Sequence, residues 1–231
     1  MAIAREAVSR LTIARLAVYY SALQKMKDDG ELVCASTRLG RRTGVASSVI
    51  RRDLAYFGGF GTKGVGYEID YLMSWIGAIL GYTTVWNTVL VGRGLPFTGP
   101  GSYYELLPPG FIITAAIDLD RKNHGSVLPG LNLPVHSLRN AGQIIKSQDI
   151  AIGLIAVPPD KTQQVANMLV KAGIKGIASF SASSVTVPDT VALSQINVTS
   201  CLSQLSYNLS TTAAKNHVYL EKERDLDWAF G

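Results

Sequence analysis

Two adjacent arginines followed by a glycine-rich segment are the side chains of this chain best suited to binding a polyanion. Arg51 and Arg52 lie in a stretch that we predict to be a short helix, and five glycines follow between residues 58 and 66, with Lys63 among them. Arginine pairs bidentately with phosphates and with guanine edges. Glycine lets a hairpin turn tightly and approach a phosphate closely. This layout is typical of a helix that enters a DNA groove beside a basic hairpin, or wing.

The net positive charge lies in the same third of the chain. The chain has 22 Lys and Arg against 17 Asp and Glu, but residues 1–67 hold 11 basic and 5 acidic residues, whereas residues 68–231 hold 11 and 12. Such an asymmetry predicts a polyanion-binding module joined to a neutral one. A basic surface that only faces water has the same composition, so charge alone leaves both interpretations open.

A second candidate site follows a predicted strand. Residues 88–91 form an apolar run that leads into Gly92-Arg93-Gly94, the beginning of a dinucleotide-binding fingerprint. Asp118 ends the next predicted strand, 24 residues after Gly94, close to the ~20 residues expected for a carboxylate that binds a ribose hydroxyl. Asp120 is a nearby alternative, and Arg93 could contact a phosphate if some other anion binds.

The fingerprint is incomplete. Phe97 stands where the third glycine belongs, and Pro96 and Pro100 lie where a helix should propagate. A proline inside a helix costs roughly 3 kcal/mol, more than the ~0.3–2 kcal/mol that an anion at a helix N-terminus returns. Two interpretations of this segment therefore remain equally open: a nucleotide-binding site, and a tight strand-to-loop turn that binds no nucleotide.

The elements that must position these residues fall into two groups. Three predicted helices and a glycine-rich hairpin, followed by a fourth helix ending at Gly81, indicate a winged helix-turn-helix. Thr43 or Ser47 is the expected N-cap of the third helix. Apolar strands that alternate with helical stretches then indicate a doubly wound parallel sheet. The predicted helices are residues 9–26, 36–39, 45–56, 69–80, 162–172 and 202–209, and the predicted strands are 88–91, 111–117, 150–157, 177–180 and 191–196.

Other classes of site are not expected. Cys34 and Cys201 lie far apart without a Cys-x-x-Cys pair, and the three histidines lack ligand spacing, so neither a metal site nor a structural disulfide is predicted. Residues 71–92 are uncharged and long enough to span a bilayer, but glycine, threonine and asparagine interrupt them. We expect a cytoplasmic protein without a membrane span or a signal peptide.

These motifs together resemble the family of redox-sensing transcriptional repressors known as Rex. The resemblance covers roughly residues 5–212 in order. It is carried by Ser9-Arg10-Leu11, Arg51-Arg52-Asp53-Leu54-Ala55-Tyr56-Phe57-Gly58, Gly61-Thr62-Lys63-Gly64-Val65-Gly66-Tyr67, Ala116-Ile117-Asp118-Leu119-Asp120, Ala156-Val157-Pro158, Ala172-Gly173-Ile174-Lys175-Gly176-Ile177, Val187-Pro188 and Gln204-Leu205-Ser206-Tyr207.

The resemblance implies a homodimeric repressor that is not an enzyme. Its expected parts are a winged-helix DNA-binding domain over residues 1–82, a Rossmann-like NAD(H)-binding domain over 83–200, and a C-terminal segment, 201–231, whose helix is swapped into the partner subunit. NAD+ would permit binding to a palindromic operator, and NADH would release it. The residues implied for DNA are Arg10, Ser47, Ser48, Arg51, Arg52, Lys63, Gly64 and Tyr67; those implied for the cofactor are Gly92, Arg93, Gly94, Tyr103, Asp118 and Phe180.

The chain departs from the family pattern at the cofactor and at signal transmission. The family's Asn-Phe-x-Pro near the nicotinamide reads Ser179-Phe180-Ser181-Ala182, and an aspartate that switches between an arginine, matched here by Arg10, and a tyrosine, matched by Tyr103, reads Asn197. Together with Phe97, these departures predict weakened or lost NAD(H) sensing. An NAD-dependent oxidoreductase and a nucleotide-binding module that does not bind DNA are the alternatives.

Overall fold

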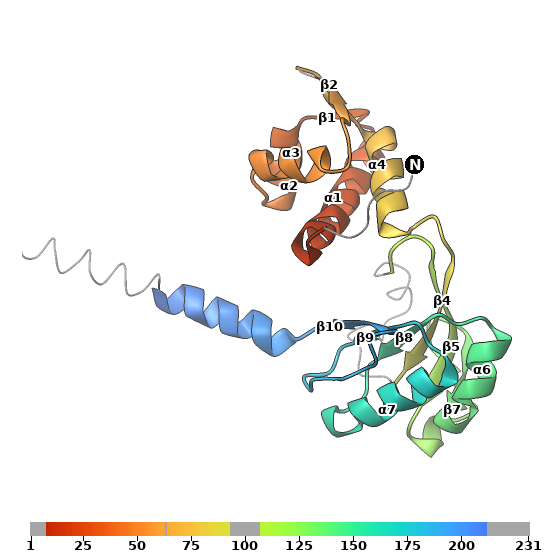
Figure 1. Cartoon of the computed structure of the whole chain (residues 1–231). Helices are drawn as coiled ribbons and strands as arrows, with labels where there is room; N and C mark the ends of the chain where they lie inside the picture. Colours follow the sequence, from red (N-terminus) through yellow and green to blue (C-terminus); the bar gives the residue numbers. More distant parts are fainter. Residues whose placement is uncertain (1–7, 63, 93–106, 212–231) are drawn as a thin grey trace, which may run out of the picture. The chain divides into compact units, whose positions relative to one another are not determined.

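The computed structural model describes residues 8–62, 64–92 and 107–211. The chain forms two compact units: the first ends at Val85 and also includes residues 108–110, and the second begins at Trp86. Figure 1 labels the helices and strands of each unit.

The first unit is a winged helix-turn-helix, as the sequence predicts. Its three short strands form an antiparallel sheet in the order β1-β3-β2, and β2 and β3 are the two sides of the wing. A buried core of apolar side chains from α1, α3 and α4 holds the unit together. The elements are α1 (Arg10–Asp28), β1 (Val33–Cys34), α2 (Ser36–Thr43), α3 (Ser47–Ala55), β2 (Gly61–Thr62), β3 (Gly66–Glu68) and α4 (Ile69–Leu80).

The turn between α2 and α3 differs from the prediction. Helix α2 continues to Thr43, and Gly44 ends it in the left-handed conformation at φ +70°. Helix α3 begins at Ser47 with Ala46 at its N-cap and no side-chain capping bond, so neither Thr43 nor Ser47 is the cap. The Thr43 hydroxyl instead donates to the Leu39 carbonyl at 2.8 Å, which is a common alternative for a threonine near a helix end.

The second unit is built on a seven-stranded sheet in the order β10-β9-β8-β4-β5-β7-β6, parallel except for the β6–β7 pair. Successive strands move outward from β4 on one side and from β8 on the other, so the strand order reverses between β4 and β8. Ligands of doubly wound sheets bind at such a reversal, beyond the carboxyl ends of the strands. The strands are β4 (Trp86–Val91), β5 (Phe111–Asp118), β6 (Val127–Leu128), β7 (Leu133–Ser137), β8 (Ile152–Ile155), β9 (Gly176–Ser179) and β10 (Ala192–Gln195).

Some elements of this unit have no counterpart in the sequence prediction. Strands β6 and β7 are short, and β7 includes Pro134 and His136, which interrupt an apolar pattern. Two of its helical segments, η2 (Leu138–Asn140) and α6 (Ala141–Ser147), have only three and seven residues. Helix α7 (Pro159–Ala172) begins three residues earlier than predicted, because proline is well tolerated in the first helical turn. The remaining helical segment, η1 (Arg121–Asn123), follows β5.

A final helix covers residues 198–211. Its side chains are exposed almost throughout, and Asn197 caps it by accepting a hydrogen bond from the Ser200 amide at 3.2 Å. Within the part of the chain that the structure describes, no helix combines the length and apolar character that crossing a membrane requires.

Candidate nucleic-acid interface and nucleotide site

Helix α3 separates a buried face from a cationic one. Ile50, Asp53 and Leu54 point into the first unit, a spacing of three and four residues that places them on one side of a helix. Arg51 and Arg52 are both exposed. Ser48 is exposed and Ser47 half-buried in the first turn, so the structure gathers these four predicted residues on one short helix.

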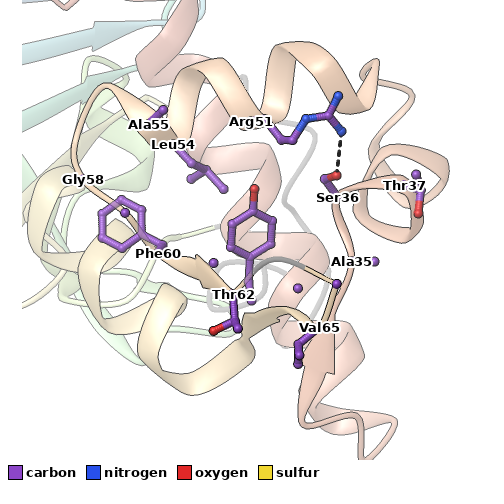
Figure 2. A pocket seen from close by; sticks show the side chains of 15 residues that line it. Ala35, Ser36, Thr37, Arg51, Leu54, Ala55, Gly58, Phe60, Thr62 and Val65 are labelled. Carbon is purple, nitrogen blue, oxygen red and sulfur yellow. Dashed lines mark hydrogen bonds between the residues drawn. The ribbon is translucent and has the colours of Figure 1, made fainter.

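A cavity of about 590 Å³ lies between α3, the start of α2 and the wing. The Arg51 guanidinium reaches across its rim and donates to the Ser36 hydroxyl at 3.1 Å (Figure 2). Its walls include five glycines, so main chain forms much of the surface: Gly58, Gly59, Gly61, Gly64 and Gly66. None of the 15 described residues that line the cavity is acidic.

The structure places the predicted wing residues unequally. Gly64 is exposed at the turn with φ +84°, whereas Lys63 lies outside the described residues. Tyr67 is only 8% exposed and belongs to the core, and burial raises the pKa of its hydroxyl. A Cβ on Gly61 would lie 2.8 Å from the Tyr67 ring. Tyr67 therefore packs the base of the wing.

A buried charge network that the sequence did not reveal fixes α3 to α1. The Asp53 carboxylate, 4% exposed, accepts from the Arg15 guanidinium at 2.6 and 2.7 Å and from the Tyr19 hydroxyl at 2.8 Å. The Arg15 hydrogen bonds hold the pKa of Asp53 below its usual value. Arg15 and Asp53 are 38 positions apart, so only the fold brings them together.

The structure also divides the cations of the first unit into paired and unpaired ones. Exposed ion pairs engage Lys27 with Asp70, Arg38 with Glu31, and Arg42 with Asp29, at 2.6–2.7 Å. Arg41, Arg51 and Arg52 form no ion pair with any described residue, and Arg10 is exposed at the start of α1. Less positive charge is therefore available to a polyanion than the composition of residues 1–67 indicates.

The candidate nucleotide site is a cavity of about 720 Å³ at the carboxyl ends of β4, β5, β8 and β9. It brings together three predicted residues, Gly92, Asp118 and Phe180. The other predicted cofactor residues, Arg93, Gly94 and Tyr103, lie outside the described residues, as do Pro96, Phe97 and Pro100. The cavity opens where the strand order reverses, which is the usual ligand position in this architecture.

Gly92 is required by the backbone. It follows β4 with φ +90°, and a Cβ there would lie 2.3 Å from the Ala156 carbonyl oxygen. Its amide donates to the Ile117 carbonyl at 2.8 Å. The first glycine of the fingerprint therefore makes the tight turn that the motif demands.

Asp118 is held at the rim of the same cavity. Its carboxylate is 8% exposed and accepts from the Asp120 amide at 3.0 Å and from the Asn123 side-chain amide at 2.7 Å. The Asp120 carboxylate is used differently, because it caps η1 through the Lys122 amide at 3.0 Å. Of the two acidic candidates, Asp118 is thus the one that is preorganised beside the cavity.

Lys161 is a further lining residue that the sequence analysis missed. It lies in the first turn of α7, and its ammonium is 3.3 Å from the Asp160 carboxylate. Among the described residues, no group of three His, Cys, Asp or Glu side chains is placed to hold a metal ion. Cys34 is buried and Cys201 exposed, and neither forms a disulfide.

Comparisons with known proteins agree with both regions. A family model described as a putative DNA-binding protein N-terminus matches residues 7–55, and one described as a CoA-binding domain matches residues 109–183. Among curated relatives, the redox-sensing transcriptional repressor Rex of Syntrophobacter fumaroxidans is 37% identical over 86% of this chain and 94% of its own length. Rex of Maridesulfovibrio salexigens is 38% identical over 88% of this chain and 97% of its own.

Solved structures give the same result. The repressor RSP in complex with NAD+ and operator DNA matches 93% of this chain and 98% of its own with a TM-score of 0.79 at 29% identity. RSP in complex with NADH matches with a TM-score of 0.78 at 28% identity, over 93% of this chain and all of its own.

Proposed function

The chain belongs to the Rex family of redox-sensing transcriptional repressors, and from this we propose that it binds operator DNA through its first unit and NAD(H) through its second. Rex proteins are DNA-binding regulators. The two alternative functions, an NAD-dependent oxidoreductase and a nucleotide-binding module that does not bind DNA, are therefore not favoured. The observation that carries the proposal is the exposed Arg51-Arg52 pair on the helix beside a glycine-walled wing, in a chain whose second unit keeps Gly92 and Asp118 at one cavity.

The DNA interface that we propose is the exposed face of α3 together with the wing. Ser48, Arg51 and Arg52 supply hydroxyl and guanidinium donors, which suit base edges and phosphates. Gly64 is exposed at the turn of the wing, and we include its sequence neighbour Lys63 in the proposed interface for its positive charge. Tyr67 supports this interface from the core, since its ring is buried.

The cofactor site that we propose is the cavity at the carboxyl edge of the sheet. The Asp118 carboxylate suits the ribose hydroxyls of the adenosine half, and Gly92 leaves room for a close approach of the ligand to the main chain. When bound, the nicotinamide would supply the redox state as a signal. We propose that Phe97 weakens this binding, since a side chain replaces the hydrogen that the third glycine provides.

We further propose that the helix over residues 198–211 pairs two copies of the chain. The helix carries an exposed apolar stripe at a spacing of four, three and four residues, which lies on one face of a helix. Its members are 57–71% exposed: Val198, Leu202, Leu205 and Leu209. A symmetric dimer would present two copies of α3, and so would select a palindromic operator.

Selection from a random pool of duplexes, followed by fluorescence anisotropy, tests the DNA proposal. We expect an enriched palindrome whose affinity falls steeply with salt, with a slope near −0.9 for each phosphate neutralised. The double variant R51A/R52A is expected to lose this binding while keeping its thermal unfolding. Failure to enrich any duplex, or full binding by the double variant, would overturn the proposal.

Calorimetric titration with NADH tests the cofactor proposal. Phe97→Gly is expected to bind NADH about tenfold more tightly than the unmodified protein, within the range that a helix N-terminus contributes to an anion. NADH, but not NAD+, should then lower the affinity for the selected palindrome. Equal affinity of the two proteins for NADH would show that Phe97 does not limit the site.

A further inference from the structure

We propose that Arg51 and Arg52 have different functions: Arg51, positioned by Ser36, binds a backbone phosphate beside the wing, whereas Arg52 reads base edges. The inference rests on the proposed operator binding, which it deepens. It also gives a role to Ser36, which no motif indicated.

The two arginines leave α3 in different directions. Successive residues of a helix are rotated by about 100°, so with Ile50, Asp53 and Leu54 against the core, Arg52 points almost directly away from the unit. Ser48, four residues before Arg52, is exposed on the same side. This face is the part of α3 that can reach the floor of a major groove.

Arg51 projects instead toward the flank of α3 that faces α2 and the wing. It lines the cavity there, together with Ser36, Thr62 and Gly64, whereas Arg52 does not line it. The hydrogen bond from the Arg51 guanidinium to the Ser36 hydroxyl holds the cation across the cavity rim (Figure 2). Its remaining N–H donors stay available to a ligand, because a guanidinium has five.

The occupant that fits this cavity is the sugar–phosphate backbone of duplex DNA. No described lining residue is acidic. The space beside Gly59 and Gly64 is open, because an added Cβ there would meet no atom within 4 Å. A recognition helix inserted in a groove is flanked by the phosphates of that groove, and a wing contacts the backbone beside it. The cavity between these two elements is therefore where a strand would pass.

Ser36 adds preorganisation rather than charge. A free arginine side chain samples many rotamers, and binding a phosphate would order it. The bond to Ser36 restricts the guanidinium before DNA arrives, so a smaller loss of freedom accompanies binding. Ser36 is thus a positioning residue for a contact that carries no sequence information.

Single and double alanine variants separate the two functions. The affinities of R51A, R52A, S36A and S36A/R51A would be measured for the selected palindrome and for a scrambled duplex over a series of salt concentrations. Ser21→Ala is the matched control, because Ser21 is an exposed serine on α1 and does not line the cavity. Thermal unfolding would verify that each variant folds.

We expect R51A to weaken both duplexes by a similar factor, about tenfold, and to reduce the salt slope by about 0.9 for each protomer on the duplex. R52A should weaken the palindrome at least tenfold more than the scrambled duplex. S36A should weaken both duplexes about threefold, without changing their ratio, and should add nothing to R51A. Ser21→Ala should leave both affinities unchanged.

Loss of discrimination in R51A, retained discrimination in R52A, or an additive effect of S36A in the R51A background would overturn the inference while operator binding stands. If the unmodified protein fails to prefer the palindrome at any salt concentration, the proposed function itself fails, and the two failures are thereby distinguished.

Discussion

Each unit buries one aspartate in its described part, and the two carboxylates are held in opposite ways. Asp53 accepts from Arg15 and Tyr19, which lie 38 and 34 positions away along the chain. Asp118 accepts from Asp120 and Asn123, two and five positions away. The first carboxylate joins two helices through a cation, whereas the second is arranged locally at the end of a strand and borders a cavity.

The difference separates a structural carboxylate from a candidate ligand-binding one. The Arg15 guanidinium forms two short hydrogen bonds to Asp53 and so uses much of the hydrogen-bonding capacity of this carboxylate. These bonds attach α3, which carries the exposed Arg51 and Arg52, to α1. Asp118 accepts from two neutral donors of its own loop and borders the cavity at the end of β5, where such folds place the carboxylate that binds a ribose hydroxyl. Burial alone therefore does not distinguish the two roles, whereas the position of Asp118 at a cavity does.

The largest expected effect tests the local backbone geometry of the second unit. Gly92→Ala places a Cβ against the Ala156 carbonyl and forces a non-glycine residue to φ +90°. We expect the free energy of unfolding to fall by about 2–5 kcal/mol, the sum of the left-handed strain and of overpacking. Urea unfolding followed by circular dichroism measures this change.

Gly125→Ala is the matched control for that experiment. Gly125 has a similar φ of +78° but no atom within 4 Å of an added Cβ, so only the conformational cost of about 1–2 kcal/mol should remain. Equal destabilisation by the two variants would mean that the contact with Ala156 does not shape the cavity.

Asp53→Asn tests the long-range bond of the first unit. We expect a loss of about 2 kcal/mol in unfolding free energy, because asparagine replaces one of the two charged oxygens that accept hydrogen bonds from the Arg15 guanidinium. Arg15 is 27% exposed, so water compensates it in part. Asp29→Asn, which breaks an exposed pair with Arg42, should cost less than about 1 kcal/mol. Similar losses of unfolding free energy in both variants would contradict the inference that Asp53 stabilises the attachment of α3 to α1.

The pH dependence of this difference has a defined sign. The pKa of Asp53 is lower in the folded protein than the ~3.9 of an unfolded aspartate, so the folded state binds fewer protons in that range. The stability that Asp53 adds over asparagine should be constant above about pH 5 and should decrease as the pH falls through the folded pKa. A difference that does not begin to decrease as the pH falls below about 4 would contradict the assignment.

The sequence predicted most elements of both units because local patterns determine them. The wing glycines, Gly81 after α4 and the apolar runs of β4, β5 and β8 are readable from a few neighbouring residues. Strand β7 and helix α6 were missed because short elements carry too few periodic positions. Contacts between distant residues were missed for a different reason: nothing near Arg15 or Ser36 in the sequence indicates Asp53 or Arg51 as a partner.

Asp118→Asn should affect ligand binding more than folding. We expect NADH affinity to fall about tenfold, since a ribose hydroxyl loses a charged acceptor, with a loss of stability smaller than that of Asp53→Asn. Asp120→Asn is the control, because Asp120 is exposed and caps η1. If Asp120→Asn weakens NADH binding and Asp118→Asn does not, then Asp120, and not Asp118, is the carboxylate that binds the ribose.

The smallest expected effect concerns another locally held side chain, Asn197. Its carbonyl caps the helix over residues 198–211 through the Ser200 amide, and replacing such a cap with alanine costs about 1 kcal/mol. Asn197→Ala should therefore weaken dimers modestly in sedimentation equilibrium, because a short helix without its cap orders less readily. Asn197→Asp keeps the cap, since aspartate and asparagine cap equally well. If aspartate weakens the dimer as much as alanine does, the charge at this position, rather than the local bond, decides the association.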